Sequence, residues 1–288
     1  MSNDTHQTAP TQFVDANGNR FAYRRFGKAG GVPLVFNQHY TGTMDHWDPA
    51  VTDGFARDRE VILFNNAGVS SSSGEVPGTF AEMGANAVAF IKALGLTKAD
   101  VLGFSIGGFV AQEITLQAPE LVRRLILLGT GPRNGEGMAA GTPEGKRIFG
   151  ASYDEPDKLW LSVFFTPSPA SQAAGQEFVK RFRLRTKDRD PEVNDKTAVA
   201  QRAAIASWGA PREKPYDYLK AIKQPTLVVN GSTDLIIYTV NSFILQQNLP
   251  KAQLIIYPDS AHGGHHQYPE LFVRHASIFL SADGDKIG

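Results

Sequence analysis

The chain has 288 residues, with 29 Lys and Arg against 29 Asp and Glu, so its formal charge is zero when histidine is neutral. This balance argues against a nucleic acid or an anionic membrane as the main partner, because both attract proteins through a concentrated positive field. The chain contains no cysteine, which excludes disulfides, thiolate metal sites and a cysteine nucleophile.

The N-terminal segment is polar and lacks the apolar core of a secretory signal. No stretch reaches the roughly 18 consecutive apolar residues of a membrane-spanning helix. We therefore expect a soluble, cytoplasmic protein with no membrane partner, and we expect its first ten or so residues to form a flexible tail.

Strands and helices alternate along most of the chain. Residues 12–26 alternate apolar and polar side chains around Asn17-Gly18, which predicts a β-hairpin. Short apolar runs, typical of strands buried on both faces, follow at 33–36, 60–64, 100–104, 124–128, 225–229 and 253–257. Helical spacing is found at 79–94, 106–117, 238–248 and 269–280. This order predicts an α/β fold with a doubly wound, mostly parallel sheet.

The alternation stops between residues 133 and 215, where a glycine-rich segment precedes three amphipathic helices at 157–165, 171–185 and 195–208. A helical block of this length between two strands of one sheet predicts an inserted cap rather than an independent domain. We assign 11–132 and 216–282 to the core and 133–215 to the cap. The aromatic residues of the cap are expected mainly to pack against the core, with one or two lining a pocket: Trp160, Phe164, Phe165, Phe178, Phe182 and Trp208.

Ser105 lies in a Gly-x-Ser-x-Gly sequence, Gly103-Phe104-Ser105-Ile106-Gly107, between a predicted buried strand and a helix. In that setting the sequence is typical of a nucleophile elbow. The turn strains the serine backbone, and glycine two residues away on each side allows strand and helix to approach. We therefore favour Ser105 as a nucleophile over a serine that only caps the helix.

A serine hydroxyl needs a hydrogen-bonded base, and the base needs an acid to orient it. Asp234 follows the strand at 225–229, and His262 follows the strand at 253–257. Both residues, like Ser105, come after the carboxyl end of a strand, where open α/β sheets place their sites. The sequence predicts a Ser105, His262 and Asp234 triad.

Other residues near His262 offer alternatives. Asp259 could replace Asp234 as the acid, but it would have to fold back onto a ring only three residues away. His265 and His266 could form a metal site with His262, yet the chain has neither cysteine nor a His-Glu-x-x-His sequence. We therefore predict no metal and no cofactor, and interpret His265 and His266 as solvated or helix-start residues.

Acyl transfer also requires donors for the oxyanion, normally two backbone N–H groups. One is expected from Ile106, the residue after the candidate nucleophile. The other is expected from the loop at 37–42, which follows the strand at 33–36.

From residue 12 to residue 280 the chain resembles a capped α/β-hydrolase. The matching segments are residues 103–107, 118–122, 230–234 and 261–263. The resemblance implies that Ser105 is the nucleophile, His262 the base and Asp234 the orienting acid. A serine at the elbow argues against the haloalkane dehalogenases and epoxide hydrolases, which are similar in fold but use a carboxylate there.

Two segments depart from the family pattern. The usual His-Gly after the third strand is His39-Tyr40 here, with Gly42 two residues later, so the Tyr40 N–H becomes the candidate second oxyanion donor. The usual Asp-x-Arg-Gly-x-Gly after the fourth strand is replaced by residues 65–70, Asn-Asn-Ala-Gly-Val-Ser. The arginine of that motif is absent, so the packing of the loop must differ.

These features predict a serine hydrolase that cleaves a small or medium carboxylic ester or lactone through an acyl-serine. The alternatives are a cofactor-free haloperoxidase or perhydrolase, a C–C bond hydrolase, or a non-catalytic ligand-binding protein of this fold. The sequence leaves the substrate and the oligomeric state open. Arg181, Arg183 and Arg185 could reach a substrate carboxylate, although a solvated helix face is the simpler interpretation.

Overall fold

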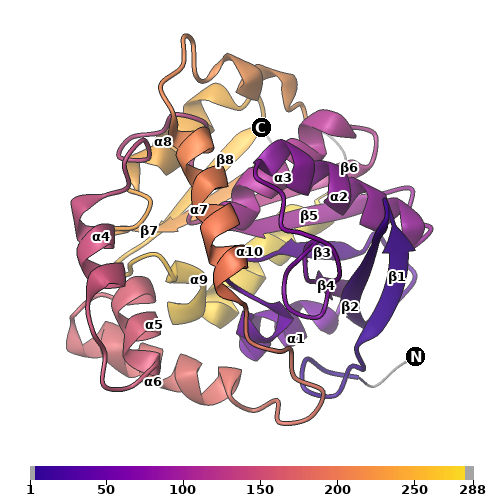
Figure 1. Cartoon of the computed structure of the whole chain (residues 1–288), viewed down its shortest axis with the longest axis horizontal. Helices are drawn as coiled ribbons and strands as arrows, with labels where there is room; N and C mark the ends of the chain where they lie inside the picture. Colours follow the sequence, from indigo (N-terminus) through magenta and orange to yellow (C-terminus); the bar gives the residue numbers. More distant parts are fainter. Residues whose placement is uncertain (1–3, 283–288) are drawn as a thin grey trace.

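The computed structural model describes residues 4–282. These residues form one sheet with helices packed on both of its faces (Figure 1). Within this range the sheet has eight strands in the order β1-β2-β4-β3-β5-β6-β7-β8. The strands are β1 (Gln12–Ala16), β2 (Asn19–Gly27), β3 (Leu34–Asn37), β4 (Glu60–Phe64), β5 (Ala99–Phe104), β6 (Val122–Leu128), β7 (Thr226–Gly231) and β8 (Ala252–Tyr257). β2 pairs antiparallel with β1 and β4, whereas all pairs from β4 to β8 are parallel. The predicted α/β fold with a mostly parallel sheet is confirmed.

The core lies on both faces of the sheet because successive residues of a strand point to opposite sides. In β5, Val101 packs into one apolar cluster with residues of α2 and α3, while Leu102 packs into the other with residues of α1 and α10. The helices outside the β6–β7 connection are η1 (Met44–His46), α1 (Pro49–Ala56), α2 (Phe80–Ala93), α3 (Ile106–Gln117), α8 (Val240–Asn248), α9 (Gly264–Gln267) and α10 (Pro269–Ser281). Burial on both faces explains why the central strands are continuous apolar runs.

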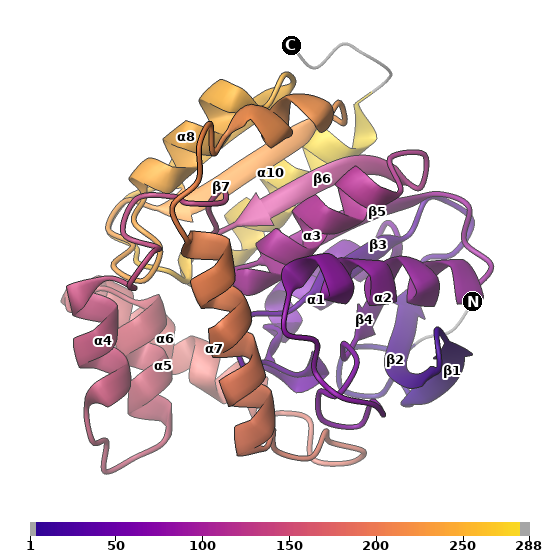
Figure 2. The same ribbon diagram turned by 45° about the horizontal axis from the view of Figure 1, so that its top comes forward.

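Within residues 4–282, the segment between β6 and β7 forms helices and no strand. They are α4 (Pro143–Gly150), α5 (Asp157–Phe164), α6 (Pro169–Phe182), α7 (Asp195–Gly209) and η2 (Asp217–Ala221). In Figure 2, α4, α5 and α6 gather at the end of the sheet toward which β6 and β7 point, with α7 beside them. Of the six cap aromatics named from the sequence, Trp160 is partly buried and the other five are buried, whereas Phe149 of α4 is 48% exposed. No helix in residues 4–282 is long and apolar enough to span a membrane.

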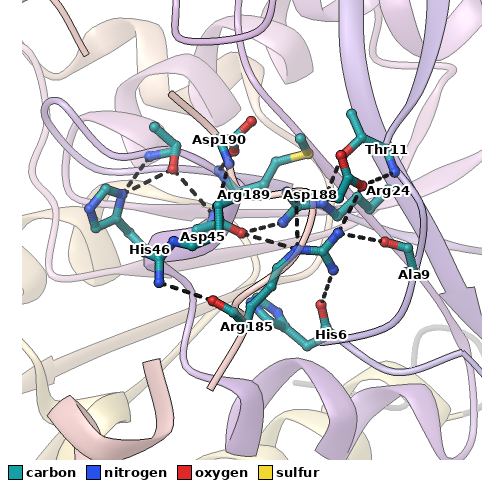
Figure 3. A network of polar contacts seen from close by, with 12 residues as sticks. His6, Ala9, Thr11, Arg24, Asp45, His46, Arg185, Asp188, Arg189 and Asp190 are labelled. Atoms are coloured by element: carbon teal, nitrogen blue, oxygen red, sulfur yellow. Dashed lines mark hydrogen bonds and ion pairs between the residues drawn. The ribbon is translucent and has the colours of Figure 1, made fainter. Parts of the chain in front are cut away.

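A buried network of charges joins the insertion to the core (Figure 3). Arg24 of β2 forms an ion pair with Asp45 of η1, and both side chains are almost fully buried. Arg185, which follows α6, is equally buried and places its Nε 3.6 Å from Asp45 Oδ1. Arg185 Nη2 also donates to Asp188 Oδ2 at 2.9 Å. Buried guanidinium groups need such partners, because an unpaired buried charge is strongly destabilising.

The N-terminal segment belongs to the same network. Arg185 donates to the backbone carbonyls of His6 at 2.8 Å and Ala9 at 3.0 Å, and both of these residues are buried. The expectation of a flexible tail is therefore wrong for residues 4–10, and Met1–Asn3 lie outside the described residues. The expectation that Arg185 lies on a solvated helix face is also wrong, because its buried guanidinium contacts three backbone carbonyls and two carboxylates.

The other two arginines also pair with the protein's own carboxylates. Arg181 forms two hydrogen bonds with Asp48, at 2.8 and 2.7 Å, and Arg183 lies 2.5 Å from Asp157. Of these two, Arg183 remains well exposed, with 60% of its side chain accessible.

The loop after β4, which lacks the family's arginine, is held by the connection between α6 and α7 and by the first turn of α7. Asn65 Nδ2 donates to Asp190 Oδ1 at 2.8 Å, and Ser71 Oγ donates to the same oxygen at 3.0 Å. Thr197 Oγ1 donates to the Gly68 carbonyl at 3.1 Å. Short polar side chains thus provide the contacts that stabilise this loop.

Replacement of Asp45 tests the importance of the buried network. Asp45→Ala leaves two buried arginines without this carboxylate, so we expect the free energy of unfolding to fall by about 3–5 kcal/mol. Urea denaturation at pH 7 measures the change. Asp154→Ala, which removes an exposed partner of Lys158, serves as the control and should unfold like the wild type. A loss below about 1 kcal/mol for Asp45→Ala would contradict this account.

Candidate active site

Ser105 occupies a strained turn between β5 and α3, with φ 56° and ψ −122°. The turn depends on the glycines two residues before and two residues after Ser105. A Cβ on Gly103 would lie 2.1 Å from the Gly107 carbonyl oxygen, and a Cβ on Gly107 would lie 2.1 Å from that of Asn37. Any side chain would force strand, helix and the loop after β3 apart.

The backbone of this turn is also hydrogen-bonded to β6 and the segment that follows it. The Ser105 N–H donates to the Leu128 carbonyl at 2.9 Å, and Thr130 Oγ1 donates to the Ser105 carbonyl at 2.8 Å. These contacts hold a conformation that a non-glycine residue rarely adopts. Ser105 is therefore fixed at the carboxyl edge of the sheet.

Asp234 and His262 meet at the same edge, in the loops after β7 and β8. His262 Nδ1 lies 2.8 Å from Asp234 Oδ2, and both side chains are buried. Asp234 Oδ1 accepts hydrogen bonds from the N–H groups of Ile236 at 2.9 Å and Ile237 at 3.0 Å. A carboxylate held in this way fixes the orientation of the imidazole and leaves its Nε2 as the nitrogen available for proton transfer.

Aromatic rings on either side connect His262 to the serine turn and to the insertion. The His262 ring centroid lies 5.0 Å from that of Phe104, the residue before Ser105, and 6.3 Å from that of Phe164, which ends α5. The Gly263 N–H donates to the Phe164 carbonyl at 3.0 Å. The structure therefore brings the loops that carry Ser105, Asp234 and His262 together beneath α5.

Asp259, the other candidate acid, contacts the insertion instead of His262. Its carboxylate accepts from Thr166 Oγ1 at 2.7 Å and from Ser168 Oγ at 2.5 Å. The hydrogen bonds from Ser168 and Thr166 lower the pKa of Asp259 below its usual value. The geometry favours Asp234.

The loop from Gln38 to Gly42, which we call the 38–42 loop, lies against the start of α3. A Cβ on Gly107 would be 2.7 Å from the Gln38 carbonyl oxygen. Three N–H groups of this loop have acceptors: His39 to Gln38 Oε1 (2.8 Å), Thr41 to Gln201 Oε1 (2.7 Å) and Gly42 to the His39 carbonyl (3.0 Å).

The Tyr40 N–H, between those groups, has no hydrogen-bond partner within residues 4–282. The N–H of Ile106, in the first turn of α3, has no acceptor inside its own helix and lies at the positive end of the helix dipole. These are the two predicted donors. A small cavity of about 30 Å³ adjoins Ile106 and the 38–42 loop, although Tyr40 itself does not line it. Its lining residues are Asn37, Gln38, His39, Gly42, Phe64, Asn66, Val69, Met83, Ile106, Val110 and Gln201.

Three further histidines, His39, His265 and His266, are buried around this edge and His46 is partly buried, which no local sequence pattern indicates. Burial lowers the pKa of His39 to about 3 and that of His46 to about 4. The same cause lowers the pKa of His265 and His266 well below the ordinary value. The expectation that His265 and His266 are solvated is wrong, although both lie in the short helix α9. Across residues 4–282, no three His, Cys, Asp or Glu side chains are arranged to hold a metal ion.

Comparison with known proteins identifies the family. Residues 32–269 match the alpha/beta hydrolase fold family. An alpha/beta hydrolase fold protein from Chitinophaga pinensis is 39% identical, with a TM-score of 0.90 over 97% of this chain and 100% of its own. The chain belongs to the alpha/beta hydrolase fold family.

More distant relatives have diverse activities. A putative carbamate hydrolase RutD from Rhizobium rhizogenes is 24% identical over 86% of this chain and 92% of its own length. A putative non-heme bromoperoxidase BpoC from Mycobacterium tuberculosis is 26% identical, over 83% and 90%. A 2-hydroxymuconate semialdehyde hydrolase from Pseudomonas putida is 27% identical, over 68% and 67%. The structure of an N-acyl homoserine lactone degrading enzyme is 25% identical, with a TM-score of 0.70, over 93% and 100%.

The buried histidines predict a loss of stability in acid. Their pKa values are lower in the folded than in the unfolded state, so the unfolded state binds more protons below about pH 6.5, and stability falls as the pH is lowered. Each such group contributes a slope of up to about 1.4 kcal/mol per pH unit.

His266→Phe tests this, because the ring of His266 is surrounded by other rings, including Phe178 at 4.4 Å and Phe164 at 5.2 Å. We expect the variant to lose less stability than the wild type between pH 6.5 and 4.5, with a slope smaller by about 1.4 kcal/mol per pH unit. Urea denaturation across this range measures both slopes. Parallel slopes would show that His266 does not contribute.

Proposed function

We propose that this protein is a serine hydrolase that cleaves a small or medium carboxylic ester or lactone through an acyl-Ser105 intermediate. The observation that carries the proposal is the buried 2.8 Å contact between His262 Nδ1 and Asp234 Oδ2, formed beside the strained turn that holds Ser105. Three reactive side chains from three separate loops of the sheet edge have the types and the order that acyl transfer requires.

In the proposed mechanism, Ser105 Oγ attacks the carbonyl carbon while its proton moves to His262 Nε2. Asp234 keeps the proton of Nδ1 in place and stabilises the imidazolium that forms. The tetrahedral oxyanion accepts hydrogen bonds from the N–H groups of Tyr40 and Ile106. His262 then gives its proton to the leaving alcohol, and the acyl group stays on Ser105.

Hydrolysis of the acyl-enzyme repeats these steps with water as the nucleophile. His262 takes a proton from water, the water oxygen attacks the acyl carbon, and the proton returns to Ser105 as the acid is released. For a lactone the leaving alcohol remains part of the same product. No redox step or bound cofactor enters this scheme.

The composition of the insertion supports an apolar group on the substrate. Trp160 and Phe164 stack at 5.4 Å, and His39, neutral at pH 7, lies 5.3 Å from the Trp160 ring. The three arginines of α6 and its C-terminal end are already paired with the protein's own carboxylates. We propose that the segment 133–215 acts as a cap over the site, with these rings facing the substrate.

The bromoperoxidase and semialdehyde hydrolase relatives support two alternatives, perhydrolysis and C–C bond cleavage at the same serine. A panel of p-nitrophenyl esters and lactones separates them from ester cleavage. Halogenation that requires both peroxide and a carboxylic acid would favour perhydrolysis. A non-catalytic ligand-binding role predicts that a fluorophosphonate probe leaves Ser105 unlabelled.

Replacement of Ser105 is the direct test. Ser105→Ala removes the attacking oxygen, so kcat/KM for p-nitrophenyl butyrate should fall at least about 10⁴-fold, and labelling by a fluorophosphonate should be lost. Ser207→Ala, at an exposed position of α7, is the matched control and should retain wild-type activity. The proposal is falsified if Ser105→Ala retains most of the hydrolysis.

Asp234→Asn tests the orienting acid. The amide cannot hold the imidazole in the required tautomer, so we expect kcat to fall about 10³–10⁴-fold with little change in KM. Asp259→Asn should leave kcat unchanged, since the Asp259 carboxylate accepts hydrogen bonds from Thr166 and Ser168 of the insertion. The opposite result would assign the acid to Asp259.

A further inference from the structure

The 38–42 loop is held in an unusual conformation by helix α7 of the insertion. Thr41 has φ 54°, in the left-handed region that β-branched residues rarely adopt. Its N–H donates to Gln201 Oε1 at 2.7 Å, and the Gln201 side chain is buried. A strained residue keeps such a conformation only where surrounding contacts fix it, and Gln201 provides one of them.

The peptide that joins Tyr40 to Thr41 is fixed at both of its polar atoms. Its N–H is bound by Gln201, and its carbonyl oxygen lies 2.9 Å from His39 Nδ1 and accepts from Thr41 Oγ1 at 2.8 Å. The Tyr40 N–H, the proposed oxyanion donor, belongs to the preceding peptide. The contacts position it indirectly, through the Tyr40 Cα that both peptides share and through the His39 ring that is held against the Tyr40 carbonyl.

The side chain of Tyr40 is bound to the same helix. Its hydroxyl accepts from Arg202 Nη1 at 2.7 Å and donates to the Ala198 carbonyl at 3.4 Å. One turn of α7 thus contacts the loop through both its backbone and its tyrosine. Figure 2 shows α7 next to the group formed by α4, α5 and α6.

Helix α7 is itself anchored at both ends, independently of the loop. Before its N-terminus, the connection from α6 is bound to the core through Arg185 and Asp190 (Figure 3). At its C-terminal end, the Trp208 ring stacks on Phe109 of α3, with centroids 4.8 Å apart and an interplanar angle of 16°. Because α3 also carries Ile106, α7 contacts the two segments that carry the proposed oxyanion donors.

We infer that Gln201 is a positioning residue for the reaction: it acts through the Thr41 N–H to aim the Tyr40 N–H at the oxyanion. This inference rests on the proposed acyl-serine mechanism and adds to it. It makes one helix of the insertion part of the machinery that stabilises the transition state, in addition to covering the substrate.

Gln201→Met tests the inference, since it keeps the length of the side chain and removes the acceptor. We expect kcat for p-nitrophenyl butyrate to fall about 10- to 100-fold with KM changed less than about threefold, below the 10²–10³-fold effect of losing a whole oxyanion donor. Phenylboronic acid forms a tetrahedral adduct with an active serine, so its inhibition constant should rise by a similar factor. If Gln201 had only a structural role, the variant would melt at a lower temperature, but kcat and the inhibition constant would not change by a similar factor.

Gln247→Met, the same substitution at an exposed position of α8, is the control and should match the wild type. Arg202→Met provides a second variant, because Arg202 is exposed and its loss does not threaten folding. It should lower kcat about two- to fivefold. Combining it with Tyr40→Phe should add nothing to the effect of Tyr40→Phe alone, because that substitution already removes the contact with Arg202.

Several outcomes would overturn the inference. The first is that Gln201→Met folds and its kcat is unchanged. The second is that its kcat falls but its inhibition constant for phenylboronic acid does not change. The third is that the effects of Arg202→Met and Tyr40→Phe are additive. Should Gln201→Met fail to fold, the Arg202 and Tyr40 variants test whether α7 positions Tyr40, and additive effects there overturn the inference. Activity that survives Ser105→Ala would instead refute the acyl-serine mechanism itself, so the two failures are distinguishable.

Discussion

The close approach of β5, α3 and the loop after β3 is the constraint on which the site depends. Ser105 can hold its left-handed conformation only because Gly103 and Gly107 leave no side chain between these three segments. The same approach sets the start of α3 against the 38–42 loop, so a single packing requirement determines where the serine and both candidate N–H donors lie. Parallel strands then bring Asp234 and His262 to this edge, since all of these loops leave the sheet at its carboxyl end.

A second, electrostatic constraint fixes the insertion on this edge. Asp45 pairs with two buried arginines, one from β2 and one from the insertion, and Asp190 binds the polar loop after β4. The family's usual arginine in that loop is missing, and the polar contacts of Asn65 and Ser71 occupy its place. The insertion is therefore attached to the core by buried charges as well as by its aromatic face, which gives α7 a defined position relative to the sheet.

The sequence predicts those features that depend on local pattern. Buried strands are continuous apolar runs, and glycine spacing around Ser105 reflects a local steric need, so the fold and the meeting of Asp234 with His262 could be inferred. The environment of Arg185, His265 and His266 could not, because their partners are distant in sequence and their residue types are usually solvated. Gln201 gives no local signal either: its importance comes from one hydrogen bond to a residue 160 positions away.

The contact of Arg185 with the N-terminal segment also has a consequence for the order of folding. The carbonyls of His6 and Ala9 lie 179 and 176 positions before the guanidinium that binds them. During synthesis, Arg24 and Asp45 emerge long before Arg185, so the first strands must wait for more than half of the chain before this cluster can close. Contacts of such separation slow folding, because the chain loses the entropy of a long loop before it gains them. His6 and Ala9 therefore dock late, although they are synthesised well before Arg185.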